Sequence, residues 1–227
     1  MGKLAPNLTA LPPRQLQIWT RLATTPKDFV LYGGTALALR LGHRESVDFD
    51  FFSSRLFQPL ELIRSIPYLA GAEITQEEAN TLSCAVPADD GVVSISFFAV
   101  SLNQVTTPDL AEGNGIAVAS LRDIFGMKCA TIPQRNEVKD YRDIHALIYR
   151  ARIGLAEGIA AAAAIYGRQY NPVLTLQALA YFDDLPDPLP AAMKADLLAA
   201  VKSVSLQNLP TVTATQRIGA GLVQGVK

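Results

Sequence analysis

The fold is decided by residues 29–52, which read FVLYGGTALALRLGHRESVDFDFF. The apolar run that opens this stretch is typical of a short buried strand, and Gly33–Gly34 ends it in a turn. Thr35 is a suitable helix cap, so we expect a short helix over residues 36–41. A second strand is predicted over residues 47–51. The stretch therefore reads as strand, glycine turn, helix and strand.

Two carboxylates share one face of the second strand. Alternate side chains of a strand point to the same side, so Asp48 and Asp50 lie together. The opposite set is expected to face the core: Val47, Phe49 and Phe51. Adjacent carboxylates repel each other, and a divalent cation with oxygen ligands, such as Mg²⁺ or Mn²⁺, removes that penalty. The alternative is two solvated aspartates at a strand end, and the strand alone does not favour either interpretation.

The glycine pair gives the two carboxylates a context. A helix that follows such a turn leaves backbone N–H groups exposed at its N-terminus, which favours phosphate binding. A glycine pair alone is a weak signal, because most such pairs are simply turns. The residues after Thr35 do not fit GxGxxG, so a dinucleotide-binding site is poorly supported. A phosphate-binding turn followed by Asp48 and Asp50 is a stronger combination, since the cation can bridge phosphates.

Residues 32–52 resemble the first motif of the AbiEii/AbiGii-type nucleotidyltransferases. These enzymes belong to the DNA polymerase β-like superfamily, and many are toxins of toxin–antitoxin or abortive-infection systems. The resemblance implies that Asp48 and Asp50 bind Mg²⁺ and are catalytic. It also implies a nucleotide-binding set made of Gly33, Gly34, Thr35, Arg44 and Ser46. The alternative for Arg44 is an ordinary surface arginine.

A second block, residues 128–143 with the sequence KCATIPQRNEVKDYRD, is similar to a later motif of the same family. By this resemblance Lys128 is catalytic, and three further residues bind nucleotide: Lys139, Asp140 and Asp143. Periodicity supports Lys128 independently, because it falls in an apolar helical stripe. A lysine there is costly unless it reaches solvent or meets an anion. The other three charges have a plainer alternative, which is a solvated helix face with Lys139 and Asp143 as an i,i+4 pair.

One feature departs from the superfamily. Polymerase β-like enzymes commonly carry a third carboxylate on a later strand, which helps to activate the attacking hydroxyl or to hold a second metal. The matching strand here, residues 92–98, places Ser94 and Ser96 on one face without an acid. Asp89 and Asp90 precede it in a predicted turn and are poorly placed. Binding of an Mg-nucleotide is therefore a safer prediction than its transfer.

The rest of the chain completes an α+β pattern. Before residue 120 we expect a helix at 12–23, a helix at 59–65, strands at 73–76, 82–86 and 92–100, a loop at 106–115 and an edge strand at 116–119. After it we expect helices at 121–132, 138–150, 155–166, 173–181 and 191–201. With the resemblance, this predicts a polymerase β-like core with a mixed sheet flanked by helices (residues 1–119). A C-terminal helical domain (residues 120–227) completes the cleft.

Composition excludes several classes of protein. The chain has 227 residues, of which 49% are hydrophobic and 18% charged, so it is not disordered. Its net charge of -1 argues against a strongly basic nucleic-acid binder. The two cysteines form no CxxC motif and only two histidines are present, which speaks against zinc and histidine-rich sites. Residues 1–11 lack the apolar core of a secretory signal, and no membrane-spanning run is present, so we expect a cytoplasmic protein.

The resemblance predicts a nucleotidyltransferase that moves a nucleoside monophosphate from an NTP to an acceptor hydroxyl. The acceptor is RNA such as tRNA, a protein or a small molecule, and an antitoxin protein is a possible partner. One alternative is a degenerate family member that binds a nucleotide or a partner without catalysis, which the missing third carboxylate favours. Another is an antibiotic-modifying nucleotidyltransferase, which would need an acidic cleft for a cationic drug.

Overall fold

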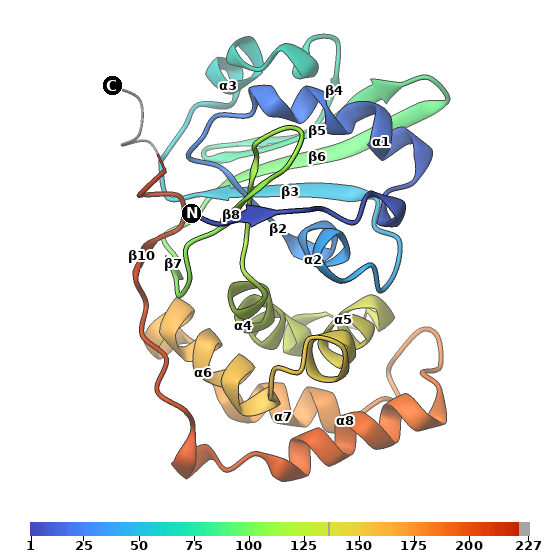
Figure 1. Cartoon of the computed structure of the whole chain (residues 1–227), viewed down its shortest axis with the longest axis vertical. Helices are drawn as coiled ribbons and strands as arrows, with labels where there is room; N and C mark the ends of the chain where they lie inside the picture. The colour runs from blue at the N-terminus through green and yellow to red at the C-terminus, as the bar shows by residue number, and fades with distance from the viewer. Residues whose placement is uncertain (136, 223–227) are drawn as a thin grey trace. The chain divides into compact units, whose positions relative to one another are not determined.

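The computed structural model describes residues 1–135 and 137–222 and divides the chain into two compact units (Figure 1). The first unit contains Met1–Leu102, Thr107–Ser120 and residues 216–222. The second contains Asn103–Thr106 and Leu121–Thr215. The chain thus leaves the first unit after Ser120 and returns to it at β10 (Gln216–Arg217).

An eight-stranded mixed sheet forms the first unit, in the order β1-β8-β9-β2-β3-β6-β5-β4. The strands are β1 (Lys3–Leu4), β2 (Val30–Tyr32), β3 (Asp48–Ser53), β4 (Glu73–Glu78), β5 (Thr81–Ala88), β6 (Gly91–Ala99), β8 (Asp109–Ala111) and β9 (Ala117–Val118). At the centre, β3 pairs antiparallel with β2 and parallel with β6. The mixed sheet with its flanking helices confirms the predicted α+β class.

Helices lie on both sides of this sheet, with α1 and α3 on one side and α2 on the other (Figure 1). The helices of the first unit are α1 (Pro13–Trp19), α2 (Gly33–Leu41) and α3 (Pro59–Ser65), with short 3₁₀ turns at Leu8–Ala10, Arg21–Thr24 and Pro67–Leu69. The alternation along β3 buries Phe49 and Phe51 on the α1 side. Phe51 stacks on Phe97 of β6 at 5.4 Å between ring centroids, and Trp19 lies 6.5 Å from Phe49. These aromatic contacts fix β3 in the middle of the core.

The structure corrects four local predictions. Val47 precedes β3 and is 52% exposed, so it does not face the core. The strand β9 lies between β8 and β2 rather than at the edge, and the segment expected to be a loop contains β8. Strands of two or three residues carry almost no periodic signal, and their pairing is decided by distant partners. The helix α2 begins at Gly33, because a left-handed φ of +73° lets β2 pass directly into it.

The described residues of the second unit contain five helices. They are α4 (Leu121–Thr131), α5 (Val138–Tyr149), α6 (Leu155–Tyr166), α7 (Pro172–Ala180) and α8 (Ala191–Ser203), accompanied by β7 (Asn103–Gln104) and by 3₁₀ turns at Ile132–Gln134, Gly167–Gln169 and Leu206–Asn208. Glycines bring α4 and α6 close together, since a Cβ at Gly126 would lie 2.9 Å from the backbone nitrogen of Ala162. Within residues 1–135 and 137–222, no helix has the length and apolarity that crossing a membrane requires.

Candidate active site

The two aspartates of β3 lie on the same face of the sheet, as the alternation predicted. In the strand register, Asp50 lies between Tyr32 of β2 and Ser96 of β6, and Asp48 lies beside Ser94 of β6. Both aspartates are half-buried. Their carboxylates are therefore held by the central strand and are still reachable from outside the sheet.

The N-terminus of α2 approaches this pair directly. A Cβ placed on Gly33 would lie 2.8 Å from Oδ2 of Asp50, and its φ of +73° is one that other residues rarely adopt. The first backbone N–H groups of a helix have no partner within the helix and carry a partial positive charge. These N–H groups therefore lie beside the carboxylate of Asp50, and this arrangement suits the binding of a phosphate group together with a cation.

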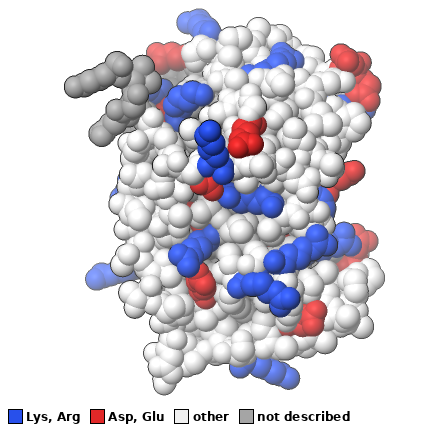
Figure 2. Space-filling view, in the orientation of Figure 1, with Lys and Arg blue, Asp and Glu red and all other residues white. Residues whose placement is uncertain are grey.

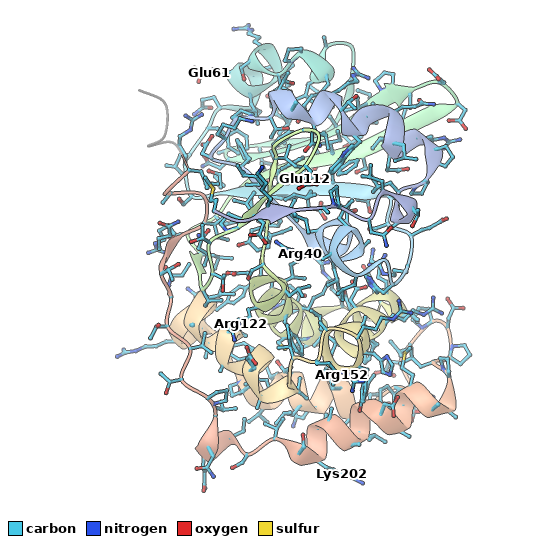
Figure 3. All side chains as sticks on the ribbon, viewed as in Figure 1. Arg40, Glu61, Glu112, Arg122, Arg152 and Lys202 are labelled. Carbon is cyan, nitrogen blue, oxygen red and sulfur yellow. The ribbon has the colours of Figure 1, made fainter. Side chains whose placement is uncertain are left out.

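Arg40 fixes the other end of α2. Its guanidinium donates to the carbonyl oxygen of Ala119 at 2.7 Å and to Oδ2 of Asp109 at 2.9 Å. Figure 3 labels this side chain on α2. Because both partners belong to the same unit, these bonds hold the helix against β8 and the end of β9.

Arg44 and Ser46 lie over the start of α2. A Cβ on Gly34 would collide with the guanidinium of Arg44 and would lie 3.1 Å from the hydroxyl of Ser46. Arg44 also donates to the carbonyl oxygen of Glu45 at 2.8 Å. The guanidinium is thus beside the helix N-terminus, where it can meet an anion.

The hydroxyl of Thr35 points inward. It is buried and lies within hydrogen-bond distance of the Asp48 carbonyl oxygen and, at 2.9 Å, of the Ser46 hydroxyl. These bonds tie α2 to the residues that enter β3. The two hydroxyls therefore position Asp48, and the part of Thr35 that can meet a phosphate is its backbone N–H.

Oxygen donors of this site fit magnesium. Mg²⁺ is usually held by one or two carboxylates and completes its shell with water and substrate phosphates. Asp48 and Asp50 supply two carboxylates, and the serines at the neighbouring positions of β6 supply hydroxyls. The hydroxyl oxygen of Ser96 lies 2.9 Å from the hydroxyl oxygen of Ser83 on β5. In the described part of the chain, no group of three or more His, Cys, Asp and Glu side chains could hold a metal. The donor set thus suits a cation that brings its own phosphate ligands.

Lys128 lies in the second unit, between two carboxylates of α5. Its Nζ is 2.5 Å from Oδ1 of Asp140 and 2.8 Å from Oδ2 of Asp143. Lys128 is 8% exposed and both aspartates are fully buried, so the solvated-face interpretation is wrong for Asp140 and Asp143. The ammonium group of Lys128 thus pairs with two carboxylates and does not extend into solvent. The second oxygen of Asp140 is buried and makes no hydrogen bond within the described residues.

The electrostatics of this cluster keep the lysine charged. Burial by itself lowers the pKa of Lys128, but the adjacent carboxylates of Asp143 and Asp140 outweigh it, so the pKa lies above its usual value. Lys139 is separate from the cluster, because it is exposed and pairs with Glu137 at 2.8 Å. That bond lowers the pKa of Glu137. The alternative i,i+4 pair of Lys139 with Asp143 is therefore wrong.

The structure brings the predicted residues together in two sets. The first unit gathers Gly33, Gly34, Thr35, Arg44, Ser46, Asp48 and Asp50, and the second gathers Lys128, Asp140 and Asp143. Sequence reasoning missed a cavity beside Asp48, which Arg14, Gln15 and Asp90 help to line. Its residues come from three separate segments, so no local motif marks it.

Comparisons with known proteins identify one family. A family model described as "Nucleotidyl transferase AbiEii toxin, Type IV TA system" matches residues 17–211. The chain is 33% identical over 162 residues to the uncharacterized protein aq_aa25 of Aquifex aeolicus, covering 69% of this chain and 75% of that protein. The fold is similar to that of JHP933 from Helicobacter pylori, with a TM-score of 0.53 at 20% identity over 83% of this chain and 87% of the other. It is also similar to MenT4, a nucleotidyltransferase toxin of Mycobacterium tuberculosis, with a TM-score of 0.52 at 18% identity over 85% and 83%.

Proposed function

This chain belongs to the AbiEii family of nucleotidyl transferase toxins of type IV toxin–antitoxin systems, and we propose that it transfers a nucleoside monophosphate from an Mg-bound NTP to a hydroxyl group of RNA. The observation that carries the proposal is the contact between the start of α2 and Asp50. Phosphate donors and a cation-binding carboxylate meet there, at a position where only glycine fits. That combination is what a metal-bridged triphosphate requires.

Each residue of the first set has a separate task in this reaction. The backbone N–H groups of Gly33, Gly34 and Thr35 bind the phosphates, and Arg44 neutralises part of their charge. Asp48 and Asp50 would hold Mg²⁺ or Mn²⁺, which when bound offsets the negative charge of the phosphates. The hydroxyls of Thr35 and Ser46 keep Asp48 in place.

The transfer itself is an in-line displacement at the α-phosphorus. The acceptor oxygen forms a bond to phosphorus while the bond from phosphorus to the α–β bridging oxygen breaks. Pyrophosphate leaves with the electron pair of that bond, and the hydroxyl proton passes to solvent water. Family resemblance makes Lys128 catalytic and assigns Lys139, Asp140 and Asp143 to nucleotide binding. The buried ion pairs keep the Lys128 ammonium charged and fixed in one orientation.

RNA such as tRNA is the acceptor that we favour, and an antitoxin is the expected protein partner. Basic and acidic side chains are interspersed among uncharged atoms on the face that Figure 2 shows. This distribution and the net charge of -1 fit a local contact with one end of an RNA better than an extensive basic surface. Both NTP and RNA are abundant in the cytoplasm, where we propose that the protein acts.

A second candidate function is nucleotide binding without transfer. It is favoured by Ser94 and Ser96, which occupy the positions of β6 beside the two aspartates. A missing third carboxylate slows activation of the attacking hydroxyl or removes it. The antibiotic-modifying alternative gains no support, because the cavity beside Asp48 pairs Asp90 with Arg14 and is not an acidic cleft.

A labelling experiment tests the proposal. The protein is incubated with Mg²⁺, total RNA and each NTP labelled at the α-phosphorus, alongside Asp48→Asn/Asp50→Asn and the control Glu73→Gln, which alters an exposed residue of β4. We expect label on RNA with the wild type and the control, and none with the double variant. Absence of label on RNA would overturn RNA as the acceptor, and metal-dependent NTP binding without label on any acceptor would overturn the transferase proposal and favour the second candidate.

A further inference from the structure

A cavity of about 440 Å³ opens beside Asp48 within the first unit. Its lining comes from the start of α1, from the residues that enter β3, and from the end of the β5–β6 hairpin. The polar side chains of the lining are Arg14, Gln15, Asp48, Asp90 and Ser94. Its volume is in the range of small-molecule pockets. The phosphate-binding motif does not account for it.

Two hydrogen bonds connect the walls of this cavity. Nε2 of Gln15 donates to the carbonyl oxygen of Val47 at 2.7 Å, which ties α1 to the entry of β3. Nε of Arg14 lies 2.8 Å from Oδ1 of Asp90, and its guanidinium carbon would be 2.7 Å from a Cβ on Gly91. The start of α1 is thereby connected to the entry of β3 and to the turn of the β5–β6 hairpin, and these three segments shape the cavity.

Gln15 carries an unsatisfied hydrogen-bond acceptor. Gln15 is 5% exposed, and its Oε1 is buried without a hydrogen-bond partner among the described residues. A buried carbonyl oxygen without a donor is unfavourable, because it has lost its hydrogen bonds to water and has formed none within the protein. A ligand in the cavity that brings an N–H donor would satisfy it.

The remaining walls are apolar and exposed. Val47 and Val92 are 52% and 55% exposed, and Pro12 and Pro13 continue the apolar lining. The charges of Arg14 and Asp90 offset each other. The cavity therefore fits a neutral ring that bears an N–H donor, and Arg14 is exposed enough to meet a phosphate as well.

The position of the cavity relative to the phosphate donors decides its role. The phosphate donors of α2 follow β2, on one side of β3, whereas Ser94 and Val92 of the cavity belong to β6, on the other side. In an in-line displacement the attacking oxygen approaches opposite the leaving pyrophosphate. The cavity and the start of α2 thus lie on opposite sides of β3 in the order of the strands, which is the arrangement that an acceptor and a leaving pyrophosphate require.

We propose that this cavity is the acceptor subsite and that it holds the terminal nucleoside of an RNA. The ribose hydroxyl lies toward Asp48, the base contacts Val47 and Val92, and an N–H group of the base donates to Oε1 of Gln15. This inference rests on the proposed transferase function and adds the residues that choose its acceptor. Gln15 is accordingly a specificity-determining residue.

Two variants test the subsite. Val92→Trp adds bulk at an exposed strand position and fills the cavity without disturbing the core, and Ile74→Trp on β4 is its matched control, since Ile74 is also exposed. With labelled NTP and short RNAs, we expect the KM for RNA to rise about tenfold in Val92→Trp, which corresponds to about 1.4 kcal/mol. We expect the Kd of the Mg-NTP to stay within about twofold, and Ile74→Trp to match the wild type.

Gln15→Leu tests the hydrogen bond itself. Among RNAs that differ in their 3′-terminal base, the wild type is expected to prefer some bases about tenfold, and Gln15→Leu to lose this preference. Wild-type labelling that Val92→Trp leaves unchanged would overturn the subsite and spare the transferase function. Label on protein instead of RNA would overturn the RNA occupant. Absence of label on every acceptor would overturn the transferase function and this inference with it.

Discussion

At the scale of single residues, the candidate site depends on a close approach between backbone and carboxylate. Gly33 has both a left-handed φ and no room for a Cβ beside Asp50. The alternation of Asp48 and Asp50 was predictable because strand periodicity is local. The inward hydroxyl of Thr35 was not, since its partners are reached only when α2 folds over the entry of β3.

Replacing Gly33 with alanine distinguishes an effect on backbone strain from an effect on nucleotide binding. Gly115 is a matched control, because its φ is +69° and nothing lies within 4 Å of its Cβ position, whereas Gly33 also meets Asp50. Both alanine variants are expected to lose about 1–2 kcal/mol of stability. Only Gly33→Ala should weaken Mg-NTP binding, by roughly tenfold. Urea unfolding and NTP titration measure the two effects, and equal NTP affinities in both variants would argue against the contact.

Lys128 is expected to matter for stability as well as for activity. Lys128→Met leaves two fully buried carboxylates without their cation, which costs about 3–5 kcal/mol. The control Lys139→Met removes an exposed pair and is expected to change stability by at most about 1 kcal/mol. Because the pKa of Lys128 is raised, its contribution is fully present below the ordinary lysine pKa and is lost as the pH rises through the higher pKa of the folded state. Urea unfolding of both variants at pH 7 measures the two losses of stability, and similar losses would contradict the prediction that the Lys128 cluster matters more.

The burial of Asp140 and Asp143 shows where helical periodicity alone misleads. Both lie on the side of α5 that the apolar pattern assigned to solvent, but they are fully buried. Their partner comes from α4, and pairing between helices leaves no mark in the period of either one. The family resemblance, in contrast, singled out all three residues together.

At the scale of elements, the long and strongly patterned segments were predictable. The five helices after residue 120 and the strands β3, β5 and β6 occur within a few residues of their expected positions. The short strands β1 and β8 were missed because they pair with each other across more than a hundred residues of sequence. Such pairing depends on the whole sheet and has no local signal.

The contact between α4 and α6 yields a prediction at this scale. Alanine at Gly126 gains helix propensity of about 1 kcal/mol, but its Cβ would lie 2.9 Å from a backbone nitrogen of α6 and 2.8 Å from a methyl group of Ile165. We expect a net loss of about 1–3 kcal/mol. Gly154→Ala is the control, since its Cβ position is open and its φ is -65°. Thermal unfolding should separate the two variants, and a raised Tm for Gly126→Ala would refute the close packing.

At the scale of the molecule, one boundary between the two units was predictable from the sequence and another was not. The change from sheet to helices near residue 120 was visible in the pattern. The return of residues 216–222 to the first unit was not, because its contacts, such as the hydrogen bond from the Ser54 N–H to the Ile218 carbonyl oxygen, join residues that are far apart in the sequence. Family membership and the mixed sheet confirm the resemblance carried by residues 32–52.

The two cysteines report on the integrity of both units. Cys84 lies in β5 and Cys129 in α4, and burial raises the pKa of each thiol. A buried thiol with a raised pKa is unreactive until its surroundings open. We expect neither to react with DTNB in native protein at pH 8 and both to react in urea. Rapid reaction of one equivalent without denaturant would contradict the packing of that unit.

We propose that Gly33–Gly34 together with Asp48 and Asp50 forms a metal-dependent triphosphate site. Calorimetric titration with non-transferable α,β-methylene NTP analogues tests it without any acceptor. We predict that Mg²⁺ strengthens binding by at least roughly tenfold in the wild type and has no such effect in Asp48→Asn/Asp50→Asn. Equal affinity with Mg²⁺ and with EDTA in the wild type, or an undiminished Mg²⁺ effect in the double variant, would contradict it.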